Sequence, residues 1–208
     1  MRALVIHCHP RPDSFTAAVR DRVLDRLRAA GAEVRLRDLY AESFDPVLSR
    51  AELDIYEDPA RNTDPVAGHV DDIRWCDTLI FVYPTWWYGL PAMLKGWLDR
   101  VLLPGVAFEM PDENGDIKPG LTHITRLGVF TTCGASWWLT RLVGDPGRRT
   151  ILRGVRLLCA RRCRTGFAAL YLMDSVTDAK CARHLDRVGR GVDKLCRSGA
   201  KPGTEVTA

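Results

Sequence analysis

The chain has 208 residues, of which 46% are hydrophobic and 27% charged, which is ordinary for a globular protein with one sizeable core. A net charge of +4 is too small to indicate a protein that binds nucleic acid. No apolar run reaches the length of a membrane span, no signal peptide opens the chain, and the seven cysteines include no CxxC pair. We therefore expect a cytoplasmic protein with reduced thiols and no insertion into a membrane.

Strand-like and helix-like segments alternate along the chain. Short apolar runs predict strands, and apolar residues at helical spacing predict helices. The expected strands lie at residues 3–7, 33–38, 78–83, 127–132 and 166–173. The expected helices lie at residues 14–30, 91–103, 150–159 and 178–196. Ser14 and Thr177 are the expected N-caps, and Gly31 is expected to end the first helix.

This alternation predicts an α/β fold with a doubly wound, five-stranded parallel sheet in the order 2-1-3-4-5 and helices on both faces. Two long segments interrupt the pattern, and either could border a site. Residues 42–70 are polar and rich in proline, and residues 106–122 contain Asn114-Gly115, a strong hairpin signal. We expect one domain over residues 1–197 and a disordered tail over residues 198–208.

The first candidate ligand-binding loop runs from His9 to Ser14 and Phe15, between the first strand and the first helix. The Ser14 hydroxyl and the free N–H groups of the first helical turn could hold a phosphate. The alternative is that Ser14 only caps the helix. The chain has no Gly-rich P-loop and no GxGxxG motif, which argues against a nucleoside triphosphate and against an ordinary dinucleotide fold.

The second candidate loop follows the third strand and contains Pro84, Thr85, Trp86, Trp87 and Tyr88. Bulky rings at the end of a buried strand are costly to expose unless something flat packs on them. Three adjacent rings cannot all face the core, so at least one points to a cleft or to a partner. The alternative is that they are core or dimer-interface aromatics. An isoalloxazine ring is the flat ligand that this loop favours.

The third candidate loop follows the fourth strand. Small hydroxyl residues and a glycine let the backbone approach a ligand closely, and two tryptophans come next. The alternative is a plain polar loop with two packed rings. These residues are Thr131, Thr132, Cys133, Gly134, Trp137 and Trp138. Because strands 1, 3 and 4 are neighbours in the expected order, all three loops should meet at the carboxyl edge of the sheet, beside its topological switch point.

The residues at this edge favour a cofactor that carries its own chemistry. Cys133 is a possible nucleophile, but the sequence places no histidine beside it. His7 and His9 are spaced like metal ligands but lack further ligands, so we expect no metal site. An aromatic and backbone-amide cradle without a nucleophile and base suits a flavin.

A local basic stretch is the remaining feature. We expect its side chains to form a solvated helix face and loop, and the alternative is contact with a phosphate or a partner. The stretch comprises Arg148, Arg149, Arg153, Arg156, Arg161, Arg162 and Arg164.

The chain resembles the NAD(P)H:quinone oxidoreductase branch of the flavodoxin-like flavoproteins over roughly residues 1–195. The most specific matching string is Trp-Tyr-Gly-Leu-Pro-Ala-Met-Leu-Lys-Gly-Trp, at residues 87–97. The other matching pieces are His9-Pro10, Ser14-Phe15, Asp38-Leu39-Tyr40, Phe44-Asp45-Pro46, Pro84-Thr85 and Thr131-Thr132-Cys133-Gly134.

The resemblance implies a flavodoxin-like fold and a homodimer with one flavin per subunit. NAD(P)H would reduce the flavin, and a quinone-like acceptor would then take two electrons in a ping-pong reaction. The cofactor is expected to be FAD, with FMN as the alternative, because the Phe44-Asp45-Pro46 segment is retained. The implied cofactor-binding residues are His9, Ser14, Phe15, Ala18, Pro84, Thr85, Trp87, Tyr88, Thr131, Thr132 and Gly134.

Three departures from the family pattern bear on the mechanism. Cys133-Gly134 stands where the family has two glycines, and Thr16 stands where mammalian members have an asparagine. Trp137 and Val143 occupy the positions of the mammalian tyrosine and histidine that are proposed to relay protons. We therefore expect no certain catalytic side chain and assign acceptor stacking to Trp137 and Trp138.

Other functions remain open at this point. Azo or nitro compounds are alternative acceptors. Some relatives are flavin-bearing regulatory subunits of potassium-efflux systems, and a one-electron carrier is a third reading.

Overall fold

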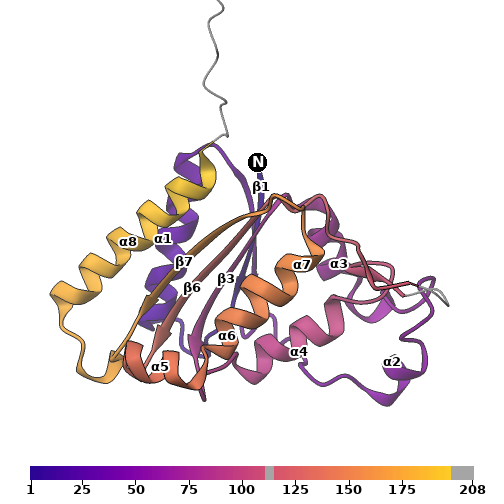
Figure 1. Ribbon diagram of the computed structural model, residues 1–208, viewed down its shortest axis with the longest axis horizontal. Coiled ribbons are helices and arrows are strands. Elements are labelled where there is room, and N and C mark those ends of the chain that lie inside the picture. Colours follow the sequence, from indigo (N-terminus) through magenta and orange to yellow (C-terminus); the bar gives the residue numbers. More distant parts are fainter. Residues whose placement is uncertain (111–114, 198–208) are drawn as a thin grey trace, which may run out of the picture.

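A five-stranded parallel sheet forms the centre of the structure, a computed structural model that describes residues 1–110 and 115–197 (Figure 1). The strand order is β2-β1-β3-β6-β7, which confirms the expected order 2-1-3-4-5 and the flavodoxin-like fold. The strands are β1 (Arg2–His7), β2 (Glu33–Asp38), β3 (Thr78–Thr85), β6 (Arg126–Cys133) and β7 (Arg164–Leu170).

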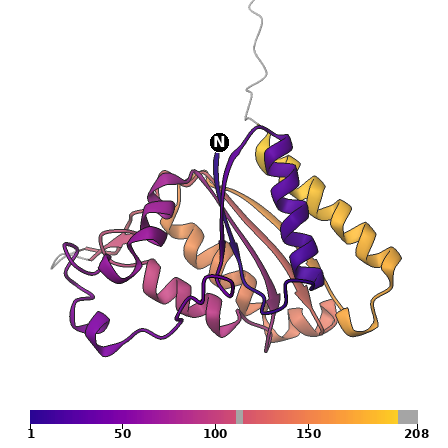
Figure 2. The same ribbon diagram turned by 180° about the vertical axis from the view of Figure 1, so that it is seen from behind.

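Two helical layers cover the sheet. Helices α1 (Phe15–Ala29) and α8 (Asp178–Cys196) lie together on one face, which Figure 2 turns toward the reader. The other face carries α3 (Ala67–Trp75), α4 (Ala92–Val101) and a continuous helical run, which are grouped on the opposite side of the strands (Figure 1). The run consists of α6 (Pro146–Arg149), the π-helical η2 (Thr150–Val155) and α7 (Arg156–Leu158).

Alternate residues of the central strands pack against one helical layer or the other. Val5 and Ile80 belong to the core beneath α1 and α8, whereas Leu4, Leu79 and Phe81 belong to the core beneath α3 and α4. Successive side chains of a strand point to opposite faces, so a strand covered on both sides must be apolar throughout. This explains why the third expected strand reads as an unbroken apolar run.

The remaining elements are short. They are α2 (Arg50–Asp54), the 3₁₀ turn η1 (Asp64–Val66), β4 (Phe108–Glu109), β5 (Lys118–Pro119), α5 (Trp137–Val143) and η3 (Met173–Ser175). Strands β4 and β5 pair in antiparallel fashion, as the hairpin signal predicts, but Asn114 of the expected turn lies outside the described residues. The expected tail at 198–208 also lies outside them. Among the helices of residues 1–110 and 115–197, none is both long and apolar enough to cross a bilayer.

The predicted helix ends are mostly confirmed. The Ser14 hydroxyl accepts a 3.1 Å hydrogen bond from the backbone N–H of Ala17, as expected of an N-cap. Gly31 follows the C-cap of α1 with a φ of 73°, which glycine adopts easily. Thr177 precedes α8 at the N-cap position, but its side chain makes no capping hydrogen bond.

Three expectations about elements were wrong. The fifth strand ends at Leu170 and not at residue 173, because Leu172 has a φ of 61° and leaves the extended conformation. The start of α5 was expected to be a loop, because Trp137 and Trp138 were assigned to the loop that follows the fourth strand. The start of α3, residues 67–70, was taken as part of the polar insertion 42–70, and no helix was expected over residues 71–75.

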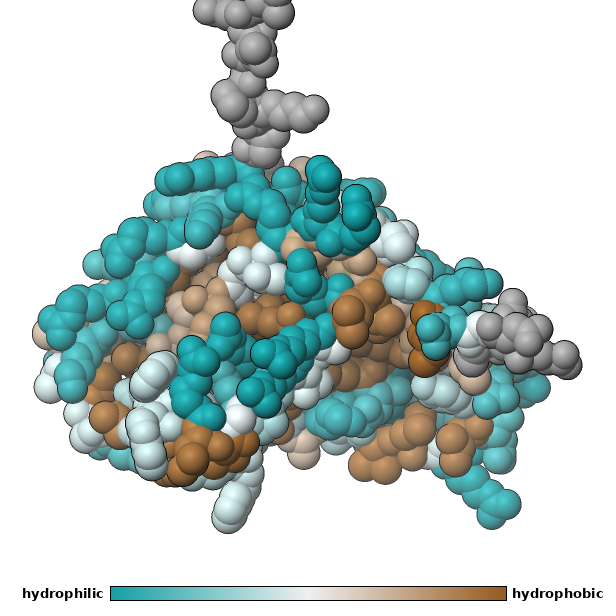
Figure 3. Space-filling model, in the orientation of Figure 1, coloured by the Kyte–Doolittle hydropathy of each residue, from teal (hydrophilic) through white to brown (hydrophobic). Residues whose placement is uncertain are grey.

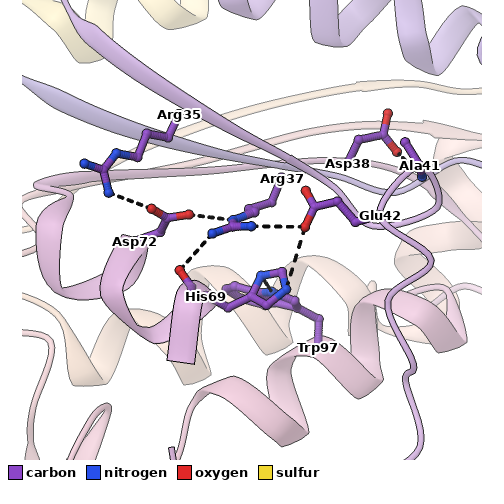
Figure 4. A network of polar contacts seen from close by, with 9 residues as sticks. Arg35, Arg37, Asp38, Ala41, Glu42, His69, Asp72 and Trp97 are labelled. Carbon is purple, nitrogen blue, oxygen red and sulfur yellow. Dashed lines mark hydrogen bonds and ion pairs between the residues drawn. The ribbon is translucent and has the colours of Figure 1, made fainter. Parts of the chain in front are cut away.

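An ion-paired network fixes α3 against the edge strand β2 (Figure 4). Asp72 is 5% exposed and accepts hydrogen bonds of 2.7 Å from Arg35 Nη1 and 2.5 Å from Arg37 Nε. On the same helix, His69 Nδ1 accepts a 3.2 Å hydrogen bond from Trp97 Nε1 of α4. Pairing on two sides compensates the burial of the carboxylate. The two arginines of β2 thus attach α3 to the sheet edge.

Gly96 tests how tightly the insertion packs on α4. A Cβ atom at Gly96 would lie 2.0 Å from the carbonyl oxygen of Pro46, so Gly96→Ala must displace the backbone. We expect a loss of about 1–3 kcal/mol in the free energy of unfolding, measured by urea denaturation. Gly154→Ala is the control, because a Cβ there meets nothing within 4 Å, and it should be neutral or stabilising by about 0.4–1 kcal/mol. Equal stability of the two variants would contradict this packing.

Candidate functional site

A cleft of about 830 Å³ opens at the carboxyl edge of the sheet, the lower edge in Figure 1. The segments that follow β1, β3, β6 and β7 form its walls. A cleft of this size and place is typical of ligand sites in open α/β sheets. Its lining residues are His9, Ser14, Phe15, Thr16, Pro84, Thr85, Trp86, Trp87, Tyr88, Thr132, Cys133, Gly134, Ala135, Met173 and Asp174.

The structure brings most of the predicted cofactor-binding residues together in this cleft. His9, Ser14, Phe15, Pro84, Thr85, Trp87, Tyr88, Thr132 and Gly134 all line it. Ala18 and Thr131 do not. Ala18 lies one turn further along α1 and is half-buried, and Thr131 is 5% exposed and alternates with Thr132 along β6. None of the described residues of the two insertions lines the cleft.

Threonine hydroxyls connect the segments that form the cleft. The Thr16 and Thr132 hydroxyls share a hydrogen bond of 3.2 Å and so join α1 to β6. The Thr85 and Thr131 hydroxyls share one of 3.0 Å and join β3 to β6. Because Thr131 and Thr132 are adjacent, one strand fixes both neighbouring segments. Thr131 thus supports the wall of the cleft from behind.

The aromatic turn after β3 is strained. Trp86 and Gly89 exchange two backbone hydrogen bonds of 3.3 and 2.9 Å, so Trp87 and Tyr88 are the central residues of a tight hairpin turn. Their φ angles are 48° and 62°, as in a type I′ turn, which favours Asn and Gly. Left-handed backbone costs a bulky residue roughly 1–3 kcal/mol. The Trp87 side chain is 94% exposed, so packing within the described chain does little to offset this cost.

Pro84 can occupy the end of the central strand β3 because the neighbouring strand β1 ends before it. The register of β1 with β3 stops at His7 opposite Val82, whereas β3 continues beside β6 to Thr85. Proline has no N–H to donate and is therefore restricted to places where a ladder is incomplete. The last two residues of β3 consequently project into the cleft beyond β1.

Some lining residues were not predicted. Met173 and Asp174 come from η3, just after β7, and were missed because the fifth strand was expected to extend to residue 173. The carboxyl end of β7 reaches the same edge as the other strands, so a correct strand end would have indicated them. Trp137 and Trp138 begin α5 and are 54% and 64% exposed, outside the lining of the cleft.

The ionisable side chains of the cleft do not form a nucleophile–base pair. Cys133 is buried, and its Sγ lies 3.7 Å from the Thr140 hydroxyl and not beside an imidazole. His9 Nδ1 lies 3.0 Å from the backbone nitrogen of Arg11 and 3.2 Å from its carbonyl oxygen, so the Arg11 backbone holds the imidazole in place. Burial lowers the pKa of His9. Within residues 1–110 and 115–197, no three His, Cys, Asp or Glu side chains are grouped to hold a metal ion.

The residues of the cleft fit a flavin. The exposed faces of Trp86 and Trp87 suit a flat ring, and Thr132 and Gly134 form a narrow opposite wall of small residues. The N-terminus of the 15-residue α1 opens into the cleft at Ser14, where first-turn N–H groups can bind a phosphate. One cleft therefore offers both an aromatic surface and an anion site.

A buried histidine lies next to the cleft. His184 of α8 is 2% exposed, and its ring centroid is 6.1 Å from that of Phe15, which lines the cleft. Neither ring nitrogen of His184 has a hydrogen-bond partner within the described chain. Burial, and secondarily the charge of Arg187, lowers its pKa to about 4. Protonation would place an unpaired charge in this core, so the folded protein keeps the ring neutral.

The chain is similar to several known proteins. A family model described as flavodoxin-like fold matches residues 1–155. An uncharacterized NAD(P)H oxidoreductase of Haemophilus influenzae is 38% identical over 137 residues, which cover 65% of this chain and 66% of that protein. A ribosyldihydronicotinamide dehydrogenase (quinone) of Rattus norvegicus is 28% identical over 159 residues, which cover 67% of each chain. The chain thus spans about two thirds of the length of these relatives.

A solved structure extends the similarity in fold to nearly the whole chain. The NAD(P)H:quinone oxidoreductase from Methanothermobacter marburgensis superimposes with a TM-score of 0.80 at 24% identity. The superposition covers 96% of this chain and 99% of that one. These comparisons confirm the resemblance that the loop motifs indicate.

His184→Leu tests the buried neutral histidine through the pH dependence of stability. Above pH 6.5 the ring is neutral in both states, but between pH 6.5 and about 4 the unfolded chain takes up a proton that the folded chain excludes. His184 alone should therefore lower the stability of the natural protein as the pH falls through this range, by about 1.4 kcal/mol per pH unit, in addition to the losses from His7 and His69, whose pKa values burial also lowers to about 4. Between pH 7 and pH 5, the free energy of unfolding measured in urea should fall by on the order of 2 kcal/mol less in the variant than in the natural protein. Equal losses in both proteins would contradict a neutral His184.

Proposed function

Because the chain belongs to the family of proteins with a flavodoxin-like fold, we propose that it is an NAD(P)H-dependent oxidoreductase that reduces quinones through a bound flavin. The observation that carries this proposal is the strained turn at Trp87 and Tyr88, which holds an exposed ring at the cleft. Strain of this kind concentrates at ligand sites. The two curated relatives, named as oxidoreductases of NAD(P)H and of quinones, support the same activity.

We assign the parts of the flavin to the walls of the cleft. Pro84, Thr85, Trp87 and Tyr88 would line one side of the ring, and the Thr132–Gly134 segment the other. His9, Ser14 and Phe15 would lie along the ribityl chain and phosphate. Ala18 and Thr131 would support these loops from outside the cleft. We propose FAD as the cofactor, with FMN as the alternative, and residues 1–197 as one flavin-binding domain.

The chain's own residues would orient the reactants and supply protons. When bound, the flavin would accept a hydride from NAD(P)H and pass two electrons to the quinone. The open face at Trp87 would admit each substrate in turn, which accounts for a ping-pong order. Val143 has no ionisable group, so the proton for the reduced quinone would come from water or from a side chain that lines the cleft, such as His9.

Three further assignments extend the proposal. Trp137 and Trp138 would stack on the acceptor at the mouth of the cleft. The exposed apolar side chains of α5, including Leu142 at 67%, favour burial in a homodimer. The seven cysteines are all free thiols, which supports a reducing compartment such as the cytoplasm.

Stopped-flow spectroscopy of the flavin-loaded protein tests the function. We expect NADH or NADPH to bleach the visible flavin absorbance in one phase, and a quinone added afterwards to restore it in a second, independent phase. An acceptor screen with azo and nitro compounds measures the alternatives. A chain that binds neither FAD nor FMN would refute the proposal. A chain that binds flavin without turnover would favour a regulatory role.

Trp87→Asn should change stability and flavin affinity in opposite directions. Asparagine tolerates left-handed backbone, so the free energy of unfolding of the flavin-free protein should rise by about 1 kcal/mol in urea titrations. Loss of ring stacking should weaken flavin binding by about 1 kcal/mol, roughly fivefold, in a fluorescence titration. Leu157→Asn, at an exposed apolar residue of α7, should leave the affinity unchanged. A variant with natural flavin affinity would place the ring elsewhere.

A further inference from the structure

A second cavity, of about 310 Å³, lies beside the flavin cleft. It is formed by α5, α6, η2 and the start of β7, and four guanidinium groups and one carboxylate line it. These are Arg141, Arg148, Arg149, Arg153 and Asp145, with Thr165 as an additional hydroxyl. Figure 3 shows hydrophilic side chains gathered over the α6–η2 run, next to hydrophobic ones over α5. The local excess is three positive charges in a concave site.

Most of these charges lack a carboxylate partner. Asp145 pairs with Arg148 at 3.6 Å, and the Arg148 guanidinium also lies 4.6 Å from the centre of the Phe167 ring. Arg141 packs on the ring of Trp137 at 5.3 Å. Within residues 1–110 and 115–197, neither Arg149 nor Arg153 makes an ion pair or a side-chain hydrogen bond. Asp145 offsets one of the four positive charges, and the remaining guanidinium groups repel one another, so an anion bound among them would be stabilised.

The rest of the basic stretch behaves differently, which singles out this cavity. Arg156 donates to the carbonyl oxygen of Cys163, and Arg164 donates to that of Lys194, so both serve the fold. Arg161 and Arg162 are exposed in the loop before β7 and do not line the cavity. Arg153 instead lies in a π-helical segment, a rare backbone form that often marks functional sites. Some arginines of the stretch thus stabilise the fold through hydrogen bonds to backbone carbonyl groups, whereas others line the cavity.

The cavity adjoins the flavin cleft through two short connections. Helix α5 begins three residues after Gly134 of the cleft and carries Arg141 of the cavity. The backbone N–H of Gly147 in α6 donates a 3.4 Å hydrogen bond to the carbonyl oxygen of Tyr88 in the aromatic turn. Helix α5 spans only roughly 10 Å, at about 1.5 Å per residue. A dinucleotide is long enough to reach from one site to the other.

We propose that this arginine cavity binds a phosphate group, as a monoester or a diphosphate. Guanidinium groups match phosphate oxygens in bidentate geometry, and an excess of three positive charges suits a dianion better than a single carboxylate. The ligand is either the phosphate-bearing end of NADPH or a separate phosphorylated molecule. Its assignment to NADPH rests on the proposed function, whereas the anion site itself does not.

Calorimetric titration at low ionic strength tests the site without any turnover. The probes are adenosine 2′,5′-bisphosphate, adenosine 5′-monophosphate and inorganic pyrophosphate. The variant Arg149→Gln/Arg153→Gln removes two unpaired charges of the cavity, and Arg161→Gln/Arg162→Gln removes two outside it. We expect the phosphate probes to bind the natural chain, with an affinity at least tenfold lower in the cavity variant and unchanged in the control variant. Circular dichroism verifies that each variant is folded.

The outcomes distinguish the two sources of phosphate. Tighter binding of the 2′,5′-bisphosphate than of the 5′-monophosphate, with displacement by NADPH, assigns the cavity to the dinucleotide. Pyrophosphate binding that NADPH does not displace assigns it to a separate phosphorylated ligand. No binding, or equal losses in both double variants, would overturn the proposal. Failure of flavin binding or of turnover would refute the proposed enzyme while leaving this result intact.

Discussion

The parallel pairing of β1, β3 and β6 is the constraint on which the site depends. His7 lies opposite Val82, and Val82 lies opposite Phe130, so the three strands run in register toward one edge. Parallel strands need crossover helices, and those helices cover both faces and make the strands apolar throughout. The edge is therefore the place where polar loops and unpaired helix N-termini can gather around a ligand.

The strand order and most of the residues that line the cleft could be predicted from the sequence, because buried strands and the turns marked by glycine or proline are encoded in short segments of the chain. The residues that could not be predicted depend on which face of a strand a side chain occupies or on where a strand ends. Thr131 and Thr132 look equivalent in sequence, yet alternation sends only Thr132 into the cleft. Asp174 was missed because the left-handed Leu172 ends β7 early. The type I′ turn at Trp87 was beyond prediction, since its residues contradict the usual preference.

The strained backbone and the exposed rings lie at the carboxyl edge of the sheet, and hydrogen bonds and ion pairs in other parts of the molecule stabilise the fold around them. Trp87 is held in strained backbone with its ring exposed, while the threonine pairs behind it fix the neighbouring segments. At the edge strand β2, Asp72 and its two arginines attach α3 to the sheet. Arg149 and Arg153, which lie near the turn and make no ion pair in the described chain, are exposed to solvent and are therefore available to an anionic ligand.

A crystal structure of the chain grown with FAD measures the central claim most directly. The account predicts an isoalloxazine ring between the Pro84–Tyr88 turn and the Thr132–Gly134 segment, with a phosphate at the N-terminus of α1 beside Ser14. It also predicts that Trp87 keeps its left-handed backbone when the ring is bound. A flavin bound at any other surface, or a cleft that stays free of flavin at saturating FAD and in a parallel crystal at saturating FMN, would contradict it.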